Sequence, residues 1–347
     1  MVSFDNRLRR RLGVARPLVQ APMAGVASPE LAAAVSRSGG LGSLGAGYMA
    51  PDAIRDAIRE VRQRTDRAFA INLFVPGPEP ARGEPEALRD LLRPLYAELG
   101  MALPRTEPAP LPAFAEQARA VLGEAVPVVS FTFGIPEAGW LRAFREQGSL
   151  LVGTATSADE AAALEQAGID VVVLQGAEAG GHRGSFLPGS DDPPRPLSPL
   201  LMEAGARVRL PLVAAGAIMT PADVREMLEA GAAAVQCGTA FIPCRESAAP
   251  LAYKEAVLAG RGEQTTITPV ISGRPARGLR NRLIEVLERR ADALPGYPRM
   301  NALTAPLRRE AARLGRADLM SLWAGTGCHL SRRLPAAELV ESLTGDL

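Results

Sequence analysis

Lysine and histidine are scarce in this sequence. Lys254 is the single lysine, and His182 and His329 are the only two histidines. Schiff-base chemistry needs a lysine amine, so it would have to use Lys254, which we place on a helix after the last predicted strand. Two histidines cannot form a histidine-rich zinc site, and we predict no metal.

Cysteine pairs, long apolar runs and an excess of one charge are also missing. The three cysteines form no C-x-x-C pair, which suits a reducing cytoplasm. No apolar run approaches the roughly 20 residues of a membrane span, and the N-terminus lacks an apolar core of secretory type. With 39 basic and 38 acidic residues the net charge is +1, which indicates neither a nucleic-acid nor a membrane partner. We expect a cytoplasmic monomer or homodimer that acts on a small molecule.

Short apolar runs alternate with helical patterns from Leu18 onward, and eight such runs can be counted. This alternation predicts an α/β fold, a (β/α)8 TIM barrel with parallel strands. The predicted strands are residues 18–23, 41–45, 69–75, 126–134, 150–156, 171–174, 211–218 and 233–241.

Two segments fall outside the barrel pattern. Residues 76–112, rich in proline, glutamate and arginine, form an insertion after the third strand that is either a lid at the barrel mouth or a solvated excursion. We assign residues 1–260 to the barrel and 261–347 to a C-terminal helical extension packed on it, without a strand set of its own. The proline-rich loop 187–199 is expected to cover the site.

The sixth predicted strand leads into the most informative stretch, "DVVVLQGAEAGGHRGSF". Gln175 closes the strand, Gly180 and Gly181 form a turn, and His182 follows. Active sites of parallel α/β proteins lie beyond the carboxyl ends of the strands, which favours a functional role for His182. The alternative is that the ring caps a backbone carbonyl or faces solvent. His329 is more readily explained as structural, though it could reach the site from above.

The last two predicted strands both end in small residues. The seventh finishes in "AAGAI", which contains Gly216, and the eighth finishes in a stretch, "QCGTA", that contains Gly238 and Thr239. Barrels that bind a phosphorylated ligand use backbone N–H groups at this place. Each glycine alone would fit a tight turn, but their occurrence on adjacent strands favours a phosphate site.

Five motifs in order resemble the nitronate monooxygenase family, formerly called 2-nitropropane dioxygenases, and its larger class in particular. They are "QAPMAGVASPELAAAVSRSGGLGSLGAG", "FAINLF", "LQGAEAGGHRGSF", "LVAAGAIMTPADVREMLEAGAAAVQCGTAF" and "SGRPARGLRNRL". The resemblance implies an FMN-dependent barrel in which His182 is the catalytic histidine. The residues that it places at FMN are Pro22, Met23, Ala24, Asn72, Gln175, Gly180, Gly181, Gly216, Ala217, Gln236, Cys237, Gly238 and Thr239.

The resemblance also implies the reaction and the substrate-facing residues. A nitronate would be oxidised with O₂ to a carbonyl compound and nitrite, and His182 would first remove the α-proton of a neutral nitroalkane. Met23, His182 and Tyr297 are expected to face the substrate, with propionate 3-nitronate as one candidate. Some members carry a tyrosine and a lysine where Asn301 and Ala305 stand here, so the size and charge of the natural substrate stay open.

Two alternatives remain at this stage. One is an FMN-dependent NAD(P)H reductase of similar fold, acting on an enoyl thioester or a quinone. The other is a phosphate-binding barrel with no redox role.

Overall fold

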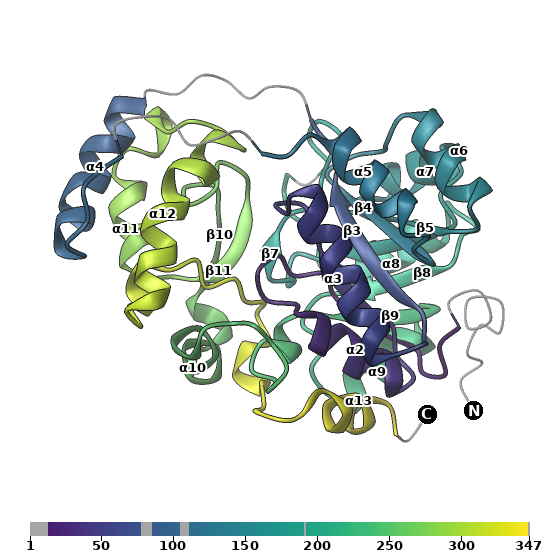
Figure 1. Cartoon of the computed structure of the whole chain (residues 1–347). Helices are drawn as coiled ribbons and strands as arrows, with labels where there is room; N and C mark the ends of the chain where they lie inside the picture. The colour runs from purple at the N-terminus through teal and green to yellow at the C-terminus, as the bar shows by residue number, and fades with distance from the viewer. Residues whose placement is uncertain (1–12, 78–84, 105–110, 191, 346–347) are drawn as a thin grey trace.

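Eight parallel strands form the central sheet of the computed structural model, which describes residues 13–77, 85–104, 111–190 and 192–345. The spatial order is β1-β9-β8-β6-β5-β4-β3-β2, and a parallel bridge between Val19 and Leu41 joins the two edges. The sheet is therefore a barrel with helices outside it (Figure 1), and the predicted (β/α)8 TIM barrel is confirmed. The strands are β1 Leu18–Gln20, β2 Gly42–Gly45, β3 Phe69–Phe74, β4 Val128–Thr132, β5 Leu150–Ala155, β6 Val171–Gln175, β8 Leu212–Ala215 and β9 Ala234–Cys237.

Helices follow the strands and cover the barrel. They are α2 Pro29–Arg37, α3 Pro51–Arg64, α5 Phe114–Gly123, α6 Ala138–Glu146, α7 Ala158–Gln166, α8 Leu197–Gly205 and α9 Pro221–Glu229. Side-chain caps begin three of them, because Ser28, Ser157 and Thr220 each accept a hydrogen bond from a backbone N–H in the first helical turn.

The strands begin within two residues of the expected places, and six of the eight end earlier than the sequence suggested, whereas β2 ends as expected and β6 ends one residue later. β1 stops at Gln20, which leaves Pro22 and Met23 in the following loop. β9 stops at Cys237, and a short 3-10 helix, η1 (Thr239–Phe241), follows it. These early ends matter because the backbone groups of loop residues are not used by the hydrogen bonds of the sheet, so they are available to a ligand.

A second sheet joins the barrel to the C-terminal segment. It consists of β10 (Thr265–Thr268), β11 (Ala276–Leu279) and β7 (Gly181–His182), all antiparallel. The expectation that residues after 261 lack strands is wrong, because the β-branched run "TTIT" pairs along its whole length with β11.

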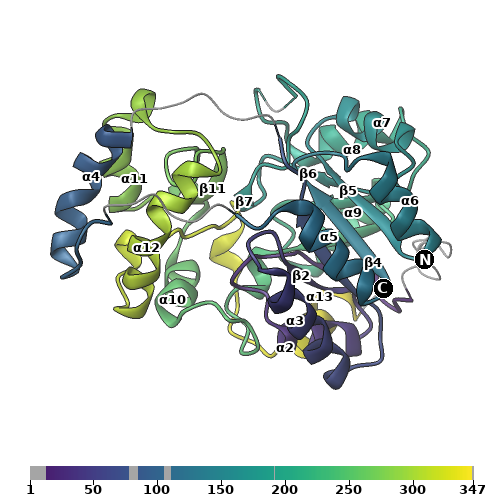
Figure 2. The same cartoon turned by 45° about the horizontal axis from the view of Figure 1, so that its top comes forward.

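The insertion after β3 packs on this C-terminal segment. Its helix α4 (Pro85–Glu98) lies against α11 (Arg282–Glu288) and α12 (Arg299–Arg313), on the side away from the barrel (Figures 1 and 2). Leu88, Leu92 and Leu95 of α4 are buried in a hydrophobic cluster that is separate from the barrel core. Residues 78–84 and 105–110 of the insertion lie outside the described residues.

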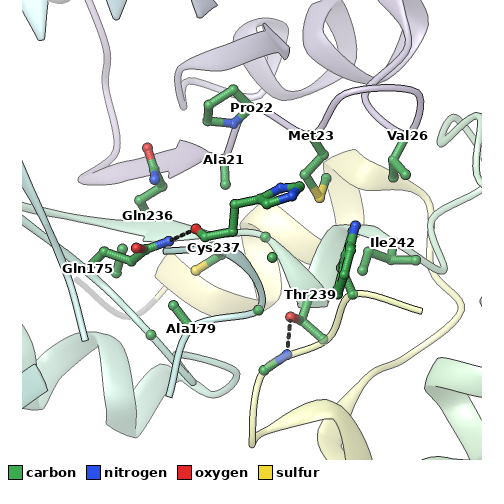
Figure 3. A pocket seen from close by; sticks show the side chains of 18 of the residues that line it. Ala21, Pro22, Met23, Val26, Gln175, Ala179, Gln236, Cys237, Thr239 and Ile242 are labelled. Atoms are coloured by element: carbon green, nitrogen blue, oxygen red, sulfur yellow. Dashed lines mark hydrogen bonds between the residues drawn. The ribbon is translucent and has the colours of Figure 1, made fainter. Parts of the chain in front are cut away.

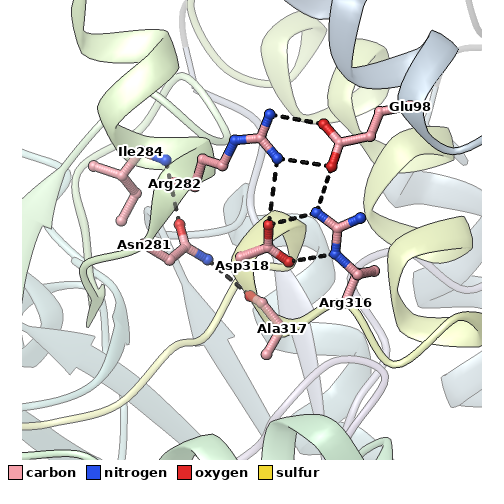
Figure 4. A network of polar contacts seen from close by, with 7 residues as sticks. All are labelled: Glu98, Asn281, Arg282, Ile284, Arg316, Ala317 and Asp318. Atoms are coloured by element: carbon pink, nitrogen blue, oxygen red, sulfur yellow. Dashed lines mark hydrogen bonds and ion pairs between the residues drawn. The ribbon is translucent and has the colours of Figure 1, made fainter.

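Charged residues tie α4 to the same segment. Both Glu98 carboxylate oxygens accept hydrogen bonds from Arg282, at 2.8 and 2.7 Å, and Arg316 donates a third at 2.6 Å. Arg316 also donates to both oxygens of Asp318, at 2.8 and 2.7 Å (Figure 4). The side chains are partly exposed, so the network adds orientation more than stability.

The end of the chain returns to the barrel. After α10 (Leu251–Ala259) and the second sheet, α13 (Ala336–Thr344) packs against α2 and α9. Among the helices that the structure describes, none is long and apolar enough to cross a membrane.

Candidate functional site

A cavity opens at the carboxyl ends of the barrel strands, between the barrel and the C-terminal segment. Figure 3 shows Pro22 and Met23 on one side of it and Gln175, Cys237 and Thr239 on the other. Met23 packs against both hydrophobic clusters, so this loop lies at their junction. The predicted residues that line the cavity are Pro22, Met23, Ala24, Asn72, Gln175, Gly180, Gly181, His182, Gly216, Ala217, Gln236, Cys237, Gly238 and Thr239.

Backbone donors collect where β8 and β9 end. Among the described residues, no acceptor is paired with the N–H groups of Gly216, Ala217 or Gly238. Gly216 has φ +147° and Ala217 has φ +51°, conformations that are costly for most residues and cluster at functional sites. The start of η1 lies beside them. This end of the cavity could hold an anionic group such as a phosphate.

Side-chain amides line another part of the wall. The Asn72 Nδ2 group donates to Ser130 Oγ and Thr132 Oγ1, both at 3.0 Å, which uses its two hydrogens and leaves Oδ1 to accept from a ligand. Gln175 donates to the His182 carbonyl oxygen at 2.9 Å and accepts from Gly184 N–H at 2.8 Å. Gln175 therefore fixes the backbone at His182 and just after it, besides lining the cavity.

His182 projects from β7, which is held by its pairing with β11. Its Nε2 lies 2.9 Å from Ser272 Oγ. The rings of Phe133, Tyr297 and Trp323 surround the imidazole, with centroids 6.0, 6.1 and 5.3 Å away. Edge-to-face and tilted ring contacts of this kind restrict ring orientation.

Two arginines set the electrostatics around His182. Burial, followed by the positive charges of Arg274 and Arg308, lowers the pKa of His182 to about 3. The guanidinium of Arg274 lies 4.0 Å from the centroid of the Phe133 ring. The imidazole is therefore neutral near pH 7.

Arg308 is relevant to the charge of the substrate, which the sequence left open because Ala305 replaces the lysine of some family members. It donates to Asn301 Oδ1 at 2.7 Å and to Thr304 Oγ1 at 3.2 Å, so its acceptors there are uncharged. Burial lowers its pKa to about 10. Although Ala305 supplies no cation, Arg308 supplies one from the same helix.

Tyr297, which was expected to face the substrate, does not line the cavity, but its ring lies 6.1 Å from the imidazole of His182 and its hydroxyl lies beside that of Tyr48. Both phenol oxygens are buried, and among the described residues they interact with each other and with no further hydrogen-bond partner. Burial raises the pKa of each phenol, and Tyr48 raises that of Tyr297 further. Two neutral hydroxyls thus lie side by side between the barrel and the C-terminal segment.

The tail of the chain supplies residues that the sequence did not reveal. Trp323, Gly325 and Gly327 line the cavity, and Thr239 Oγ1 accepts a hydrogen bond from Gly325 N–H at 3.0 Å (Figure 3). A Cβ on Gly180 would lie 2.6 Å from the Ala324 carbonyl carbon, so Gly180 admits the tail backbone. The glycines of "WAGTG", residues 323–327, were the sequence feature that could have indicated a close approach of the tail to the cavity.

Three other expectations can be placed. His329 is exposed on η5 (Cys328–Leu330) and does not line the cavity. The cavity lining includes no described residue of the loop 187–199. The Leu187 N–H and Ser190 Oγ of this loop donate hydrogen bonds to Glu160 instead, so the described part of the loop does not cover the site.

Lys254 lies on the predicted helix, α10, and donates to the Cys244 carbonyl oxygen at 2.6 Å. In the described part of the chain, no three His, Cys, Asp or Glu residues are grouped as metal ligands.

Comparison with known proteins gives consistent matches over the whole chain. The nitronate monooxygenase family model matches residues 6–346. A nitronate monooxygenase of Pseudomonas aeruginosa is 43% identical over 358 residues, covering 99% of each chain. The solved structure of nitroalkane oxidase from Streptomyces ansochromogenes has a TM-score of 0.89 at 40% identity, covering 97% of this chain and 96% of that one. FabK from Thermotoga maritima has a TM-score of 0.77 at 27% identity, covering 98% and 95%.

Proposed function

Because this chain belongs to the nitronate monooxygenase family, we propose that it oxidises alkyl nitronates with O₂ to carbonyl compounds and nitrite, using bound FMN. The observation that carries this proposal is one cavity with anion-binding backbone groups at one end and His182 at the other. Propionate 3-nitronate is a candidate substrate, and small nitroalkanes are further ones.

The residues around the cavity fit FMN. The unpaired N–H groups of Gly216, Ala217 and Gly238 would hold the phosphate, as backbone groups do in other phosphate-binding barrels. Asn72 Oδ1 remains free to accept from the imide N–H of the flavin ring, and Gln236 offers a side-chain amide. Pro22, Met23 and Ala24 would line the ring through their backbone.

FMN, when bound, supplies the two-electron oxidation and the reaction with O₂. The protein's residues bind and orient the substrate. Arg274 and Arg308 place positive charge near His182, which favours an anionic nitronate. The rings of Phe133, Tyr297 and Trp323 exclude water from this part of the cavity.

For a neutral nitroalkane, His182 would take the α-proton and the substrate would keep the electron pair as a nitronate. The imidazole is neutral near pH 7, which is the form a base requires. The burial and the two positive charges that lower its pKa to about 3 also weaken it as a base, and the negative charge that forms on the substrate would offset them. The two arginines would stabilise the anion as it forms. A substrate added as the nitronate has already lost this proton and would not need the base.

A visible spectrum of the purified protein, followed by a nitrite assay, tests the proposal. We expect the absorption of bound FMN, and nitrite production from propionate 3-nitronate or small alkyl nitronates. Under anaerobic conditions a nitronate should bleach the flavin. Rapid bleaching by NADH or NADPH, with no nitronate turnover, would instead support a reductase, and a colourless protein without flavin affinity would support a non-redox phosphate-binding barrel.

The role of His182 has a separate test. His182→Asn should abolish nitroalkane turnover and leave part of the nitronate oxidation, whereas His329→Asn should affect neither. Equal loss of both activities in His182→Asn would refute the role of base.

A further inference from the structure

We propose that Ser272 is a positioning residue that holds His182 with its proton on Nε2 and leaves Nδ1 as the basic atom. This inference rests on the proposed function of His182 as a base, and it specifies which atom of the ring performs it.

Ser272 is fully buried in the turn between β10 and β11. Because His182 pairs with Ala276 in the second sheet, the turn is held against the imidazole. Three contacts meet at Ser272 Oγ: His182 Nε2 at 2.9 Å, the Arg274 carbonyl oxygen at 3.1 Å and the Arg274 N–H at 3.4 Å.

Counting hydrogens decides the direction of these contacts. A serine hydroxyl has one hydrogen to donate and two lone pairs. The Arg274 carbonyl oxygen can only accept, so Ser272 donates its hydrogen there. Its two lone pairs then accept from the Arg274 N–H and from His182, which must therefore carry a hydrogen on Nε2.

The opposite arrangement leaves one contact unmade. If Ser272 donated to Nε2, its oxygen would face the Arg274 carbonyl oxygen at 3.1 Å with no hydrogen between them. Two oxygen atoms whose lone pairs face each other at this distance, with no hydrogen between them, repel each other. The first arrangement satisfies all three contacts and is the one that we adopt.

A neutral imidazole carries one hydrogen, so this arrangement leaves Nδ1 unprotonated. No described residue hydrogen-bonds to Nδ1, and His182 lines the cavity. In the proton transfer, the α-C–H bond of a nitroalkane breaks and its electron pair stays on the substrate. The new N–H bond forms at Nδ1, which gives an imidazolium with Nε2–H still donated to Ser272.

Nitrogen NMR of histidine-labelled protein tests the tautomer directly. The chain has only two histidines, and His329→Gln removes the exposed one, so a single imidazole remains. Long-range ¹H–¹⁵N correlations should show a protonated Nε2 and an unprotonated Nδ1 near pH 7. A protonated Nδ1 would overturn the proposal. The spectrum needs no turnover, and it decides the question even if a Ser272 variant fails to fold.

Variants then test whether Ser272 is responsible. Ser272→Ala should make the imidazole a mixture of tautomers. Its kcat/KM for a nitroalkane should fall roughly 10- to 100-fold, while that for a nitronate changes less than about 3-fold. The matched control is Ser149→Ala, which also removes a buried hydroxyl that donates to a carbonyl oxygen, Val126 O at 2.7 Å, but at the other end of the barrel.

The two proposals fail in different ways. If the wild type oxidises neither nitroalkanes nor nitronates, the proposed function is wrong whatever tautomer is found. If the wild type is active but Ser272→Ala keeps a single Nε2–H tautomer and full nitroalkane activity, Ser272 is not the positioning residue.

Discussion

The indole ring of Trp323 lies 5.3 Å from the imidazole of His182, with 55° between the two ring planes. Trp323 comes from the tail of the chain and His182 from β7, so the tail completes the wall of the cavity. The second tryptophan, Trp140, lies on α6 and packs against Phe114 instead.

This difference gives a test of flavin binding that does not depend on turnover. A flavin ring near His182 should quench the fluorescence of Trp323 strongly, because the efficiency of quenching falls steeply with the distance between indole and flavin. We expect FMN added to the apoprotein to quench the fluorescence of Trp140→Phe, which retains Trp323, more than that of Trp323→Phe. Equal quenching in both variants would contradict a flavin next to Trp323.

Gly180 is expected to tolerate no side chain, because the tail backbone occupies that space. A Cβ would lie 2.6 Å from both Ala324 C and Gly325 N, atoms that cannot rotate away. Gly180→Ala should lower the free energy of unfolding by about 1–3 kcal/mol and weaken FMN binding. Gly139→Ala on α6, where no atom lies within 4 Å of the added carbon, should instead be neutral or stabilise by up to about 1 kcal/mol. Urea unfolding with FMN titration measures both effects.

The sequence identified those parts of the site that directly follow strands. Buried parallel strands are continuous apolar runs, so the region where each strand ends, and with it Gly216, Gly238 and His182, can be located to within about four residues, although the last strand residue cannot. The order of the strands around the barrel follows from chain order, since each βα unit lies beside the next.

The residues that the sequence missed reach the cavity through tertiary packing. Ser272 contacts His182 from 90 positions away, and Trp323 does so from farther along the chain. Local periodicity in the sequence gives no information on contacts between residues so far apart along the chain. The position of α4 was missed for the same reason, because its apolar face could be assigned to a partner only once α11 and α12 were placed.

The lowered pKa of His182 predicts a pH dependence of stability. Its pKa is about 3 in the folded protein and near 6.5 when unfolded, so between these values the unfolded chain binds one more proton. The stability of the fold is therefore unaffected by this titration above pH 6.5. As the pH falls below 6.5, the free energy of unfolding decreases by up to about 1.4 kcal/mol per pH unit. His182→Gln should show a flatter decline between pH 6.5 and 4 than the wild type. His329→Gln is the control, and an unchanged decline in His182→Gln would show that the histidine is not held neutral.

The ion network at α4 predicts a second pH effect, which arises from an acidic side chain instead of a basic one. Hydrogen bonds from Arg282 and Arg316 lower the pKa of Glu98 to about 2. The carboxylate therefore stabilises the fold above the pKa of the unfolded chain, and this contribution is lost as the pH falls toward 2. Because Glu98 is exposed, we expect a small effect that 1 M salt suppresses. Glu98→Gln should lower the urea midpoint at pH 7 in low salt and lower it less at pH 3, whereas Glu229→Gln, exposed on α9, should leave the midpoint unchanged at both values.

The phenols of Tyr48 and Tyr297, whose described partner is each other, should contribute less to stability than a phenol paired with the backbone. Because the two hydroxyls interact only with each other, Tyr48→Phe and Tyr297→Phe should each lower the free energy of unfolding by less than about 1 kcal/mol. Tyr253 is the matched control, because its hydroxyl donates to the Trp323 carbonyl oxygen, and Tyr253→Phe should cost about 0.5–2 kcal/mol.

Substrate binding should show the reverse order for Tyr48 and Tyr297. If their hydroxyls bind the oxygen atoms of a nitronate, each Phe variant loses a stronger, charge-assisted hydrogen bond when substrate is present. KM for the nitronate should rise roughly 3- to 30-fold in either variant, with kcat changed less. An unchanged KM would mean that the two hydroxyls do not contact the substrate. A loss of stability as large as that of Tyr253→Phe would mean that the two hydroxyls are held firmly by each other, and would contradict their donation to a ligand.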